Sequence, residues 1–123
     1  MIHLDTSFLI RAMVSGSPQD LRLREWLRSG ERLHMSAMGW TEFLCGPVGP
    51  QHVELAVRVV PERLAFTDEE AVLAAKLFNQ SGRRRGSLTD CMIAATALRQ
   101  EARLATVNPD DFRRFDDMRV ISG

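Results

Sequence analysis

The chain has 123 residues, and its 16 basic and 16 acidic residues cancel to a net charge of zero. This length predicts a single domain over residues 1–123, with a hydrophobic core that is stable without disulfide bonds. A neutral chain creates no overall field of the kind that marks many nucleic-acid-binding proteins. No apolar run approaches the roughly 18 residues of a membrane span, and Asp5 interrupts the first apolar stretch, which argues against a signal peptide. We expect a cytoplasmic protein with no membrane association.

Among the basic residues, 15 are arginine and only one, Lys76, is lysine. A reaction that needs a lysine side chain therefore has a single candidate in this chain. The two cysteines, Cys45 and Cys91, lie in apolar, helix-like segments. We expect both to be reduced and buried.

Short apolar runs alternate with segments of helical periodicity along the chain. Ser36 is placed to cap a helix, and Thr67 and Glu70 have capping-box spacing, with the acids of that first turn expected to be solvated. Residues 81–86 are expected to form a loop. The strands are expected at residues 1–4, 32–35, 63–66, 104–107 and 118–122. The helices are expected at residues 7–15, 19–29, 37–45, 50–60, 68–79 and 88–100.

Strands that alternate with helices predict a parallel sheet with helices on both faces. The expected class is α/β, with three layers, α/β/α, around a central and mainly parallel sheet. In such a sheet, ligands bind beyond the carboxyl ends of the strands.

Four carboxylates belong to elements that approach this edge of the sheet. Asp5 directly follows the first strand, and Asp111 follows the fourth strand just after Asn108. Glu42 lies in the helix after the second strand, and Asp90 lies in the first turn of the helix that leads into the fourth strand. The three aspartates also have a structural explanation, because Asp at a helix start caps the helix or interacts with its dipole.

Glu42 is harder to explain as a structural residue. It lies between Trp40 and Phe43 in the middle of a helix. A buried carboxylate costs several kcal/mol unless it has a partner, and a bound cation would remove that cost.

The sequence lacks the residue patterns of a zinc site, a cysteine nucleophile and a phosphate-binding loop. His3, His34 and His52 are scattered without zinc-ligand spacing, Cys91 has no paired histidine, and no glycine-rich phosphate loop is present. Oxygen ligands without His or Cys suit Mg²⁺ or Mn²⁺. These ions activate water and stabilise negative charge on a phosphodiester.

Four segments, in this order, resemble the PIN domain, and more narrowly the VapC-type toxins of bacterial toxin–antitoxin pairs. The resemblance spans residues 2–112. Any one of these motifs is weakly specific, but four in register make a strong signal. The segments are Ile2–Ser7, Ser36–Gly46, Leu88–Ala97 and Thr106–Phe112.

The resemblance implies a metal-dependent ribonuclease with a doubly wound fold. Its acids correspond to Asp5, Glu42 and Asp90, which would hold Mg²⁺ or Mn²⁺ and carry out catalysis. Many relatives have Asp where this chain has Asn108, so Asn108 as metal ligand and Asp111 as catalytic acid both remain open for the fourth position, as does the number of metal ions. The residues expected to orient these ligands or water are Thr6, Ser7 and Thr106.

The family also implies partners: an RNA substrate, a small cognate antitoxin and a second copy of the chain in a homodimer. With no net charge, RNA binding must be local, and Arg83, Arg84 and Arg85 precede the helix of Asp90. A solvated loop is the alternative for this run. Arg113 and Arg114 adjoin the last motif and are a second candidate contact. The residues expected to form the antitoxin groove, or otherwise ordinary core, are Phe8, Leu9, Trp26 and Leu27.

Three other functions remain open at this point. One is an RNA-processing PIN nuclease outside any toxin system, and another is a degenerate PIN domain that only binds RNA or protein, which Asn108 keeps possible. The third is a phosphotransfer protein of similar fold, which needs a lysine near the site. Lys76 lies in mid-helix, away from any strand end, which disfavours it.

Overall fold

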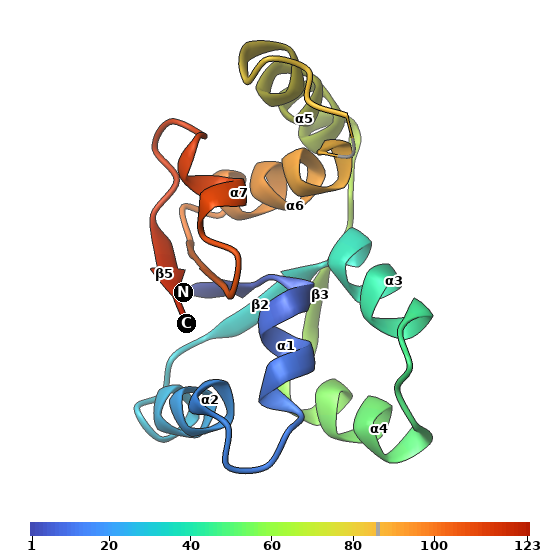
Figure 1. The fold of residues 1–123 in the computed structure, drawn as a ribbon, viewed down its shortest axis with the longest axis vertical. Helices are drawn as coiled ribbons and strands as arrows, with labels where there is room; N and C mark the ends of the chain where they lie inside the picture. The colour runs from blue at the N-terminus through green and yellow to red at the C-terminus, as the bar shows by residue number, and fades with distance from the viewer. Residues whose placement is uncertain (86) are drawn as a thin grey trace.

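The computed structural model describes residues 1–85 and 87–123, and its strands form one sheet (Figure 1). The strand order is β3-β2-β1-β4-β5, and all four pairings are parallel, which confirms the predicted α/β class. Gly86, at the end of the predicted loop, lies outside the described residues. The strands are β1 (Ile2–Leu4), β2 (Leu33–Ser36), β3 (Glu62–Leu64), β4 (Arg103–Thr106) and β5 (Val120–Ser122).

Seven helices in the described ranges surround the sheet, with α1, α2 and α4 on one side and α5, α6 and α7 on the other (Figure 1). None of them is long and apolar enough to span a membrane. The last helix, α7, is not among the helices expected from the sequence. The helices are α1 (Thr6–Ala12), α2 (Pro18–Arg28), α3 (Ala37–Cys45), α4 (Pro50–Val59), α5 (Asp68–Gln80), α6 (Leu88–Arg99) and α7 (Asp110–Arg113).

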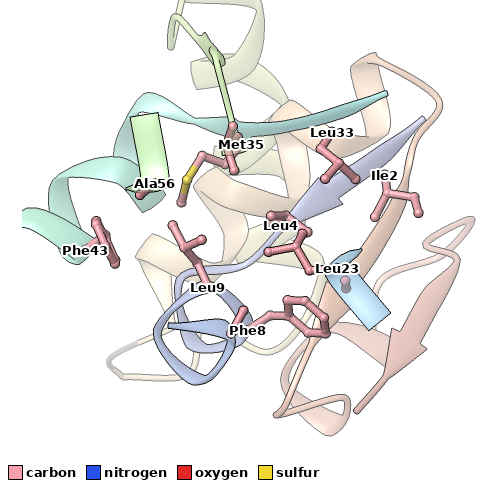
Figure 2. Close-up of a cluster of buried hydrophobic side chains, with 12 residues drawn as sticks. Ile2, Leu4, Phe8, Leu9, Leu23, Leu33, Met35, Phe43 and Ala56 are labelled. Atoms are coloured by element: carbon pink, nitrogen blue, oxygen red, sulfur yellow. The ribbon is translucent and has the colours of Figure 1, made fainter. Parts of the chain in front are cut away.

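Each face of the sheet has its own hydrophobic core, because side chains alternate between the faces along a strand. In β4, Leu104 packs with α5, α6 and α7, whereas Ala105 belongs to the core under α1, α2 and α4. Figure 2 shows this second core, in which Phe8 and Leu9 are fully buried. Of the two alternatives for Phe8 and Leu9, the structure supports ordinary core and not an antitoxin groove.

Helices α5 and α6 are joined by an ion pair in which the carboxylate is buried and the guanidinium is exposed. Glu70 is buried, accepts a hydrogen bond from the Thr67 backbone N–H as the capping box predicts, and also pairs with Arg99. The hydroxyl of Thr67 and the guanidinium of Arg99 more than offset the burial of Glu70, so its pKa is lowered. The expectation that all acids of this turn are solvated is wrong for Glu70.

Two histidines are buried side by side where β1 pairs with β2. His3 Nδ1 lies 2.7 Å from His34 Nδ1, and His3 Nε2 accepts a hydrogen bond of 3.1 Å from the Ser36 backbone N–H. A neutral histidine has one donor and one acceptor nitrogen. His3 therefore carries its proton on Nδ1 and donates it to His34. This neutral pair fixes the register that brings Ser36, the cap of α3, beside β1.

Low pH should destabilise the fold through the His3–His34 pair. Burial, and then the neighbouring His34, lower the pKa of His3 from 6.5 to about 3. Between these values the unfolded chain binds a proton that the folded chain excludes, so the free energy of unfolding falls as the pH is lowered, by several kcal/mol in total.

Urea denaturation at several pH values measures this effect. His3→Gln, which retains an acceptor for Ser36, should flatten the pH dependence between 6.5 and about 3, whereas His52→Gln on α4 should leave it unchanged. Equal slopes for the wild type and His3→Gln would contradict the assignment.

Candidate active site

The sheet changes winding direction between β1 and β4. From β1 the chain continues through β2 to β3 on one side, and β4 and β5 lie on the other. In an open parallel sheet, such a switch point leaves a crevice at the carboxyl ends of the two strands. Leu4 pairs with Ala105 at this end, and the next backbone N–H, that of Asp5, donates to the carbonyl of Ala105 at 2.9 Å. The first predicted acid thus lies at the switch point.

Asp5 is held there by two hydroxyl groups. Its Oδ2 accepts hydrogen bonds from Ser7 Oγ at 2.6 Å and from Thr106 Oγ1 at 2.9 Å, and neither hydroxyl bonds Oδ1. Asp5 is the N-cap residue of α1, but its side chain makes no capping hydrogen bond. Burial raises the pKa of Asp5 by more than the two hydroxyls and the backbone N–H groups of Thr6 and Ser7 lower it.

Glu42 lies beside Asp5 through a contact between α1 and α3. Thr6 Oγ1 is 3.0 Å from Glu42 Oε1 and 2.9 Å from the carbonyl oxygen of Gly39, and its single proton serves both acceptors. The close approach depends on Gly39, because an added Cβ would lie 3.3 Å from Thr6 Oγ1. Ser36 caps α3 as predicted, accepting from the Gly39 N–H at 2.9 Å.

One expectation for Glu42 is wrong. The side chain of Glu42 is exposed, whereas its neighbour Phe43 packs into the core. Its carboxylate accepts the hydrogen bond from Thr6. It therefore has no desolvation cost that a cation must remove. Glu42 contributes to the candidate site through its negative charge, which acts on Asp90.

Asp90 is half-buried in the first turn of α6. Ser87 makes no side-chain cap and donates its hydroxyl to the Arg84 carbonyl, so the capping box suggested by the spacing is not formed. The pKa of Asp90 is raised to about 6, first by burial and then by the charges of Asp111, Asp5 and Glu42, with Arg114 acting in the opposite direction. The other three predicted acids therefore lie near enough for their charges to act on Asp90.

Asn108 and Asp111 are the two candidates for the fourth residue of the acid site. Asn108 is exposed, and its backbone N–H donates to Thr106 Oγ1 at 3.0 Å. Asp111 is half-buried on α7, and its charge raises the pKa of Asp90 more than any other charge does. Pro109 and the acids after it were the sequence signal for this helix start.

The acids do not form a preassembled metal site. Within residues 1–85 and 87–123, no three acidic, His or Cys side chains lie close enough together to hold an ion. Four carboxylates with few compensating cations nevertheless fit a hard divalent cation in charge and in ligand type. The residues therefore suit Mg²⁺ or Mn²⁺, provided that the side chains move closer when the ion binds.

The predicted RNA-contacting arginines differ in exposure. Arg83, Arg84 and Arg85 are all exposed just before α6, and Arg83 lies over the ring of Phe78. Arg113 is exposed and lies 3.7 Å from Asp110. The side chain of Arg114, in contrast, is turned into the protein.

The two cysteines are also different from each other. Cys91 is buried, and burial raises the pKa of its thiol, which supports its exclusion as a nucleophile. Cys45 is exposed at the end of α3, so the expectation that it is buried is wrong.

A parallel α/β domain with acids at its switch point has the architecture in which α/β proteins bind ligands beyond the strand ends. The model of the PIN domain family matches residues 2–118. The chain belongs to the PIN domain family. No curated protein matches it at a significant level.

Solved structures of toxin–antitoxin proteins have the same fold. VapBC2 from Rickettsia felis, bound to a DNA fragment from its promoter, aligns with a TM-score of 0.80 at 19% identity over 100% of this chain and 99% of that one. VapBC-1 from nontypeable Haemophilus influenzae gives 0.74 at 25% identity over 99% and 98%. Mycobacterium tuberculosis VapC20, a sarcin–ricin loop cleaving toxin, gives 0.63 at 17% identity over 87% and 88%.

The acid site should destabilise the metal-free protein. In the unfolded chain Asp90 ionises near pH 3.8, whereas in the folded chain it holds its proton until about pH 6, so stability falls as the pH rises through this window. Asp90→Asn should therefore raise the free energy of unfolding at neutral pH in EDTA, by about 1–2 kcal/mol.

Chemical denaturation with a matched control tests this expectation. Asp68→Asn changes the same charge at an exposed position in the first turn of α5 and should give no gain. A loss of stability in Asp90→Asn would mean that attractive contacts, not repulsion, dominate at this carboxylate.

Proposed function

We propose that this chain, as one domain over residues 1–123, is an endoribonuclease toxin that depends on Mg²⁺ or Mn²⁺ and is neutralised by an antitoxin. The observation that carries the proposal is the position of Asp5 at the carboxyl ends of β1 and β4, where Ser7 and Thr106 hold it and where its charge, with those of Asp111 and Glu42, acts on Asp90. Carboxylates at a strand-end crevice are the ligands that a phosphodiester-cleaving metal site needs. VapC20, which has the same fold, is a toxin that cleaves RNA at the sarcin–ricin loop.

In the proposed mechanism, Asp5, Glu42, Asp90 and Asp111 hold the divalent cation. When bound, the cation lowers the pKa of water and stabilises the charge of the phosphodiester during hydrolysis. Ser7 and Thr106 fix Asp5 through Oδ2.

The other predicted residues of the site position the acids or add a ligand. Thr6 ties Glu42 to the start of α1. Asn108, exposed at the end of β4, is an additional neutral oxygen ligand. The ionised form of Asp90 is the one that binds a cation, so binding strengthens as the pH rises through about 6.

RNA would bind through local positive charge around the acids. Arg83, Arg84 and Arg85 lie at the entrance to α6, which carries Asp90, and their exposure lets them reach phosphates on either side of the cleaved bond. Arg113, two residues after Asp111 on α7, is exposed and would add a further contact.

The antitoxin would occupy an apolar groove between α1, α2 and α4. This cavity of about 220 Å³ is lined by Leu27, which is 45% exposed, and Leu55, which is 40% exposed, together with other apolar residues and the charged pair Asp20 and Arg24. Exposed apolar side chains around a groove favour a protein partner. The fold neighbours include VapBC2 and a Klebsiella pneumoniae toxin–antitoxin complex. A homodimer is part of the same proposal.

Metal-dependent RNA cleavage is the direct consequence of this proposal. The chain should cut tRNA, rRNA or mRNA with Mg²⁺ or Mn²⁺ and stop in EDTA. Asp5→Asn should reduce the cleavage rate about 100-fold, because it removes a charged ligand at the centre of the site. Gel analysis of end-labelled RNA measures the rate.

Asp68→Asn is the matched control and should cleave like the wild type, since its carboxylate is exposed on α5. Equal rates for Asp5→Asn and the wild type would refute the catalytic assignment. Absence of both cleavage and metal binding in the wild type would favour a degenerate, binding-only PIN domain. Cleavage without any neutralising partner protein would favour an RNA-processing nuclease.

A further inference from the structure

Arg114 carries a positive charge whose two terminal nitrogens are buried. Its Nε donates to the carbonyl oxygen of Asp111 at 3.0 Å, and its Cζ lies 4.6 Å from the centre of the Phe115 ring. Nη1 and Nη2 are inaccessible to solvent, and no acceptor within residues 1–85 and 87–123 bonds them. A guanidinium does not lose its proton in a protein, so this charge is permanent. A buried charge is unfavourable unless opposite charge lies nearby.

The acid site supplies opposite charge near Arg114. Phe115, on which the guanidinium stacks, packs in the same core as Cys91, near the start of α6. Burial and the neighbouring acids raise the pKa of Asp90, and the charge of Arg114 acts in the opposite direction. It also opposes the rise that burial causes in the pKa of the Cys91 thiol. The guanidinium therefore lies beside the first turn of α6, although no carboxylate of the described residues bonds Nη1 or Nη2.

We propose that Arg114 is a built-in countercharge of the acid site, which offsets part of the carboxylate repulsion in the metal-free protein and, by the same charge, weakens the binding of a divalent cation. The second effect rests on the proposed function, because it requires that the acids bind a cation. The terminal nitrogens of Arg114 are buried, so the residue acts through its charge and not by touching RNA. A cation that enters the site is repelled by this fixed positive charge.

A purely structural role for Arg114 is the competing explanation. The hydrogen bond from Nε to the Asp111 carbonyl and the stacking on Phe115 both tie the end of α7 to the domain. If these contacts were its whole role, loss of Arg114 would destabilise the protein by the same amount whatever the charge at Asp90. It would also leave cation binding unchanged or weaker. The countercharge predicts the opposite result in both respects.

A double-mutant cycle, measured by urea denaturation in EDTA at neutral pH, tests the countercharge without any metal. Arg114→Gln should destabilise the chain, because it leaves the carboxylate repulsion uncompensated. Asp90→Asn should then raise the folding equilibrium constant at least fivefold more in the Arg114→Gln background than in the wild type. Asp68→Asn, exposed in the first turn of α5, is the matched control and should have the same effect in both backgrounds. Additive effects of Arg114→Gln and Asp90→Asn would overturn the proposal.

Two further variants keep the cycle valid if Arg114→Gln folds poorly. Arg114→Met removes the charge but keeps an unbranched stem that packs against Phe115, and it should couple to Asp90→Asn as Arg114→Gln does. Arg114→Lys retains the charge without the fork, so in this background Asp90→Asn should have nearly its wild-type effect. An equally large gain from Asp90→Asn in the Arg114→Lys background would mean that charge is not the cause, and would overturn the proposal.

Mn²⁺ binding, measured from the electron paramagnetic resonance signal of the free ion, tests the effect on the cation. Arg114→Gln and Arg114→Met should bind Mn²⁺ about five- to tenfold more tightly than the wild type, and Arg114→Lys should bind it like the wild type. Arg28→Gln removes an exposed, solvent-screened charge from α2 and should also bind like the wild type. Equal or weaker binding in Arg114→Gln would overturn the effect on the cation.

The two measurements separate this proposal from the proposed function. If no variant binds Mn²⁺, the proposed function fails and the effect on cation binding fails with it. Coupling between Arg114 and Asp90 in EDTA would still establish the countercharge, because that cycle involves no metal. If Mn²⁺ binds but the cycle is additive, the proposed function stands and the countercharge is refuted.

Discussion

The hydrogen bond from Thr106 to Asp5 is the contact on which the candidate site depends. It joins the carboxyl ends of β1 and β4, the two strands between which the sheet changes winding direction. Ser7 adds a second hydroxyl to the same carboxylate oxygen. The backbone fold and the position of the first acid are therefore fixed together, because the same strand pairing sets both.

Electrostatic repulsion is the second constraint. A sheet edge that collects carboxylates is unfavourable without a cation, and the raised pKa of Asp90, which is due first to burial and then to the charges of Asp111, Asp5 and Glu42, reflects that cost in part. Function and stability are opposed here, as is common at active sites. The net charge of zero thus conceals two local regions, an acidic one at the switch point and basic segments at the entrance of α6 and around α7.

Much of this arrangement could be predicted from the chain alone. The alternation of strands with helices predicted the α/β class. The position of Asp5 after a buried strand, and the resemblance of four motifs in order, pointed to the acids whose charges act on Asp90. What the sequence did not reveal depends on which way a side chain faces. Periodicity could not tell that Glu42 projects outward while Phe43 enters the core, or that Glu70 pairs with Arg99.

The central claim is that the acids form one site for a divalent cation, and the ionisation of Asp90 reports on it most directly. Carboxyl ¹³C NMR of the isotope-labelled chain, followed through a pH titration with and without Mg²⁺, measures this ionisation. The account predicts that Asp90 titrates at about 6 without the ion and at a clearly lower pH with it. An ordinary Asp90 pKa that Mg²⁺ leaves unchanged would contradict it.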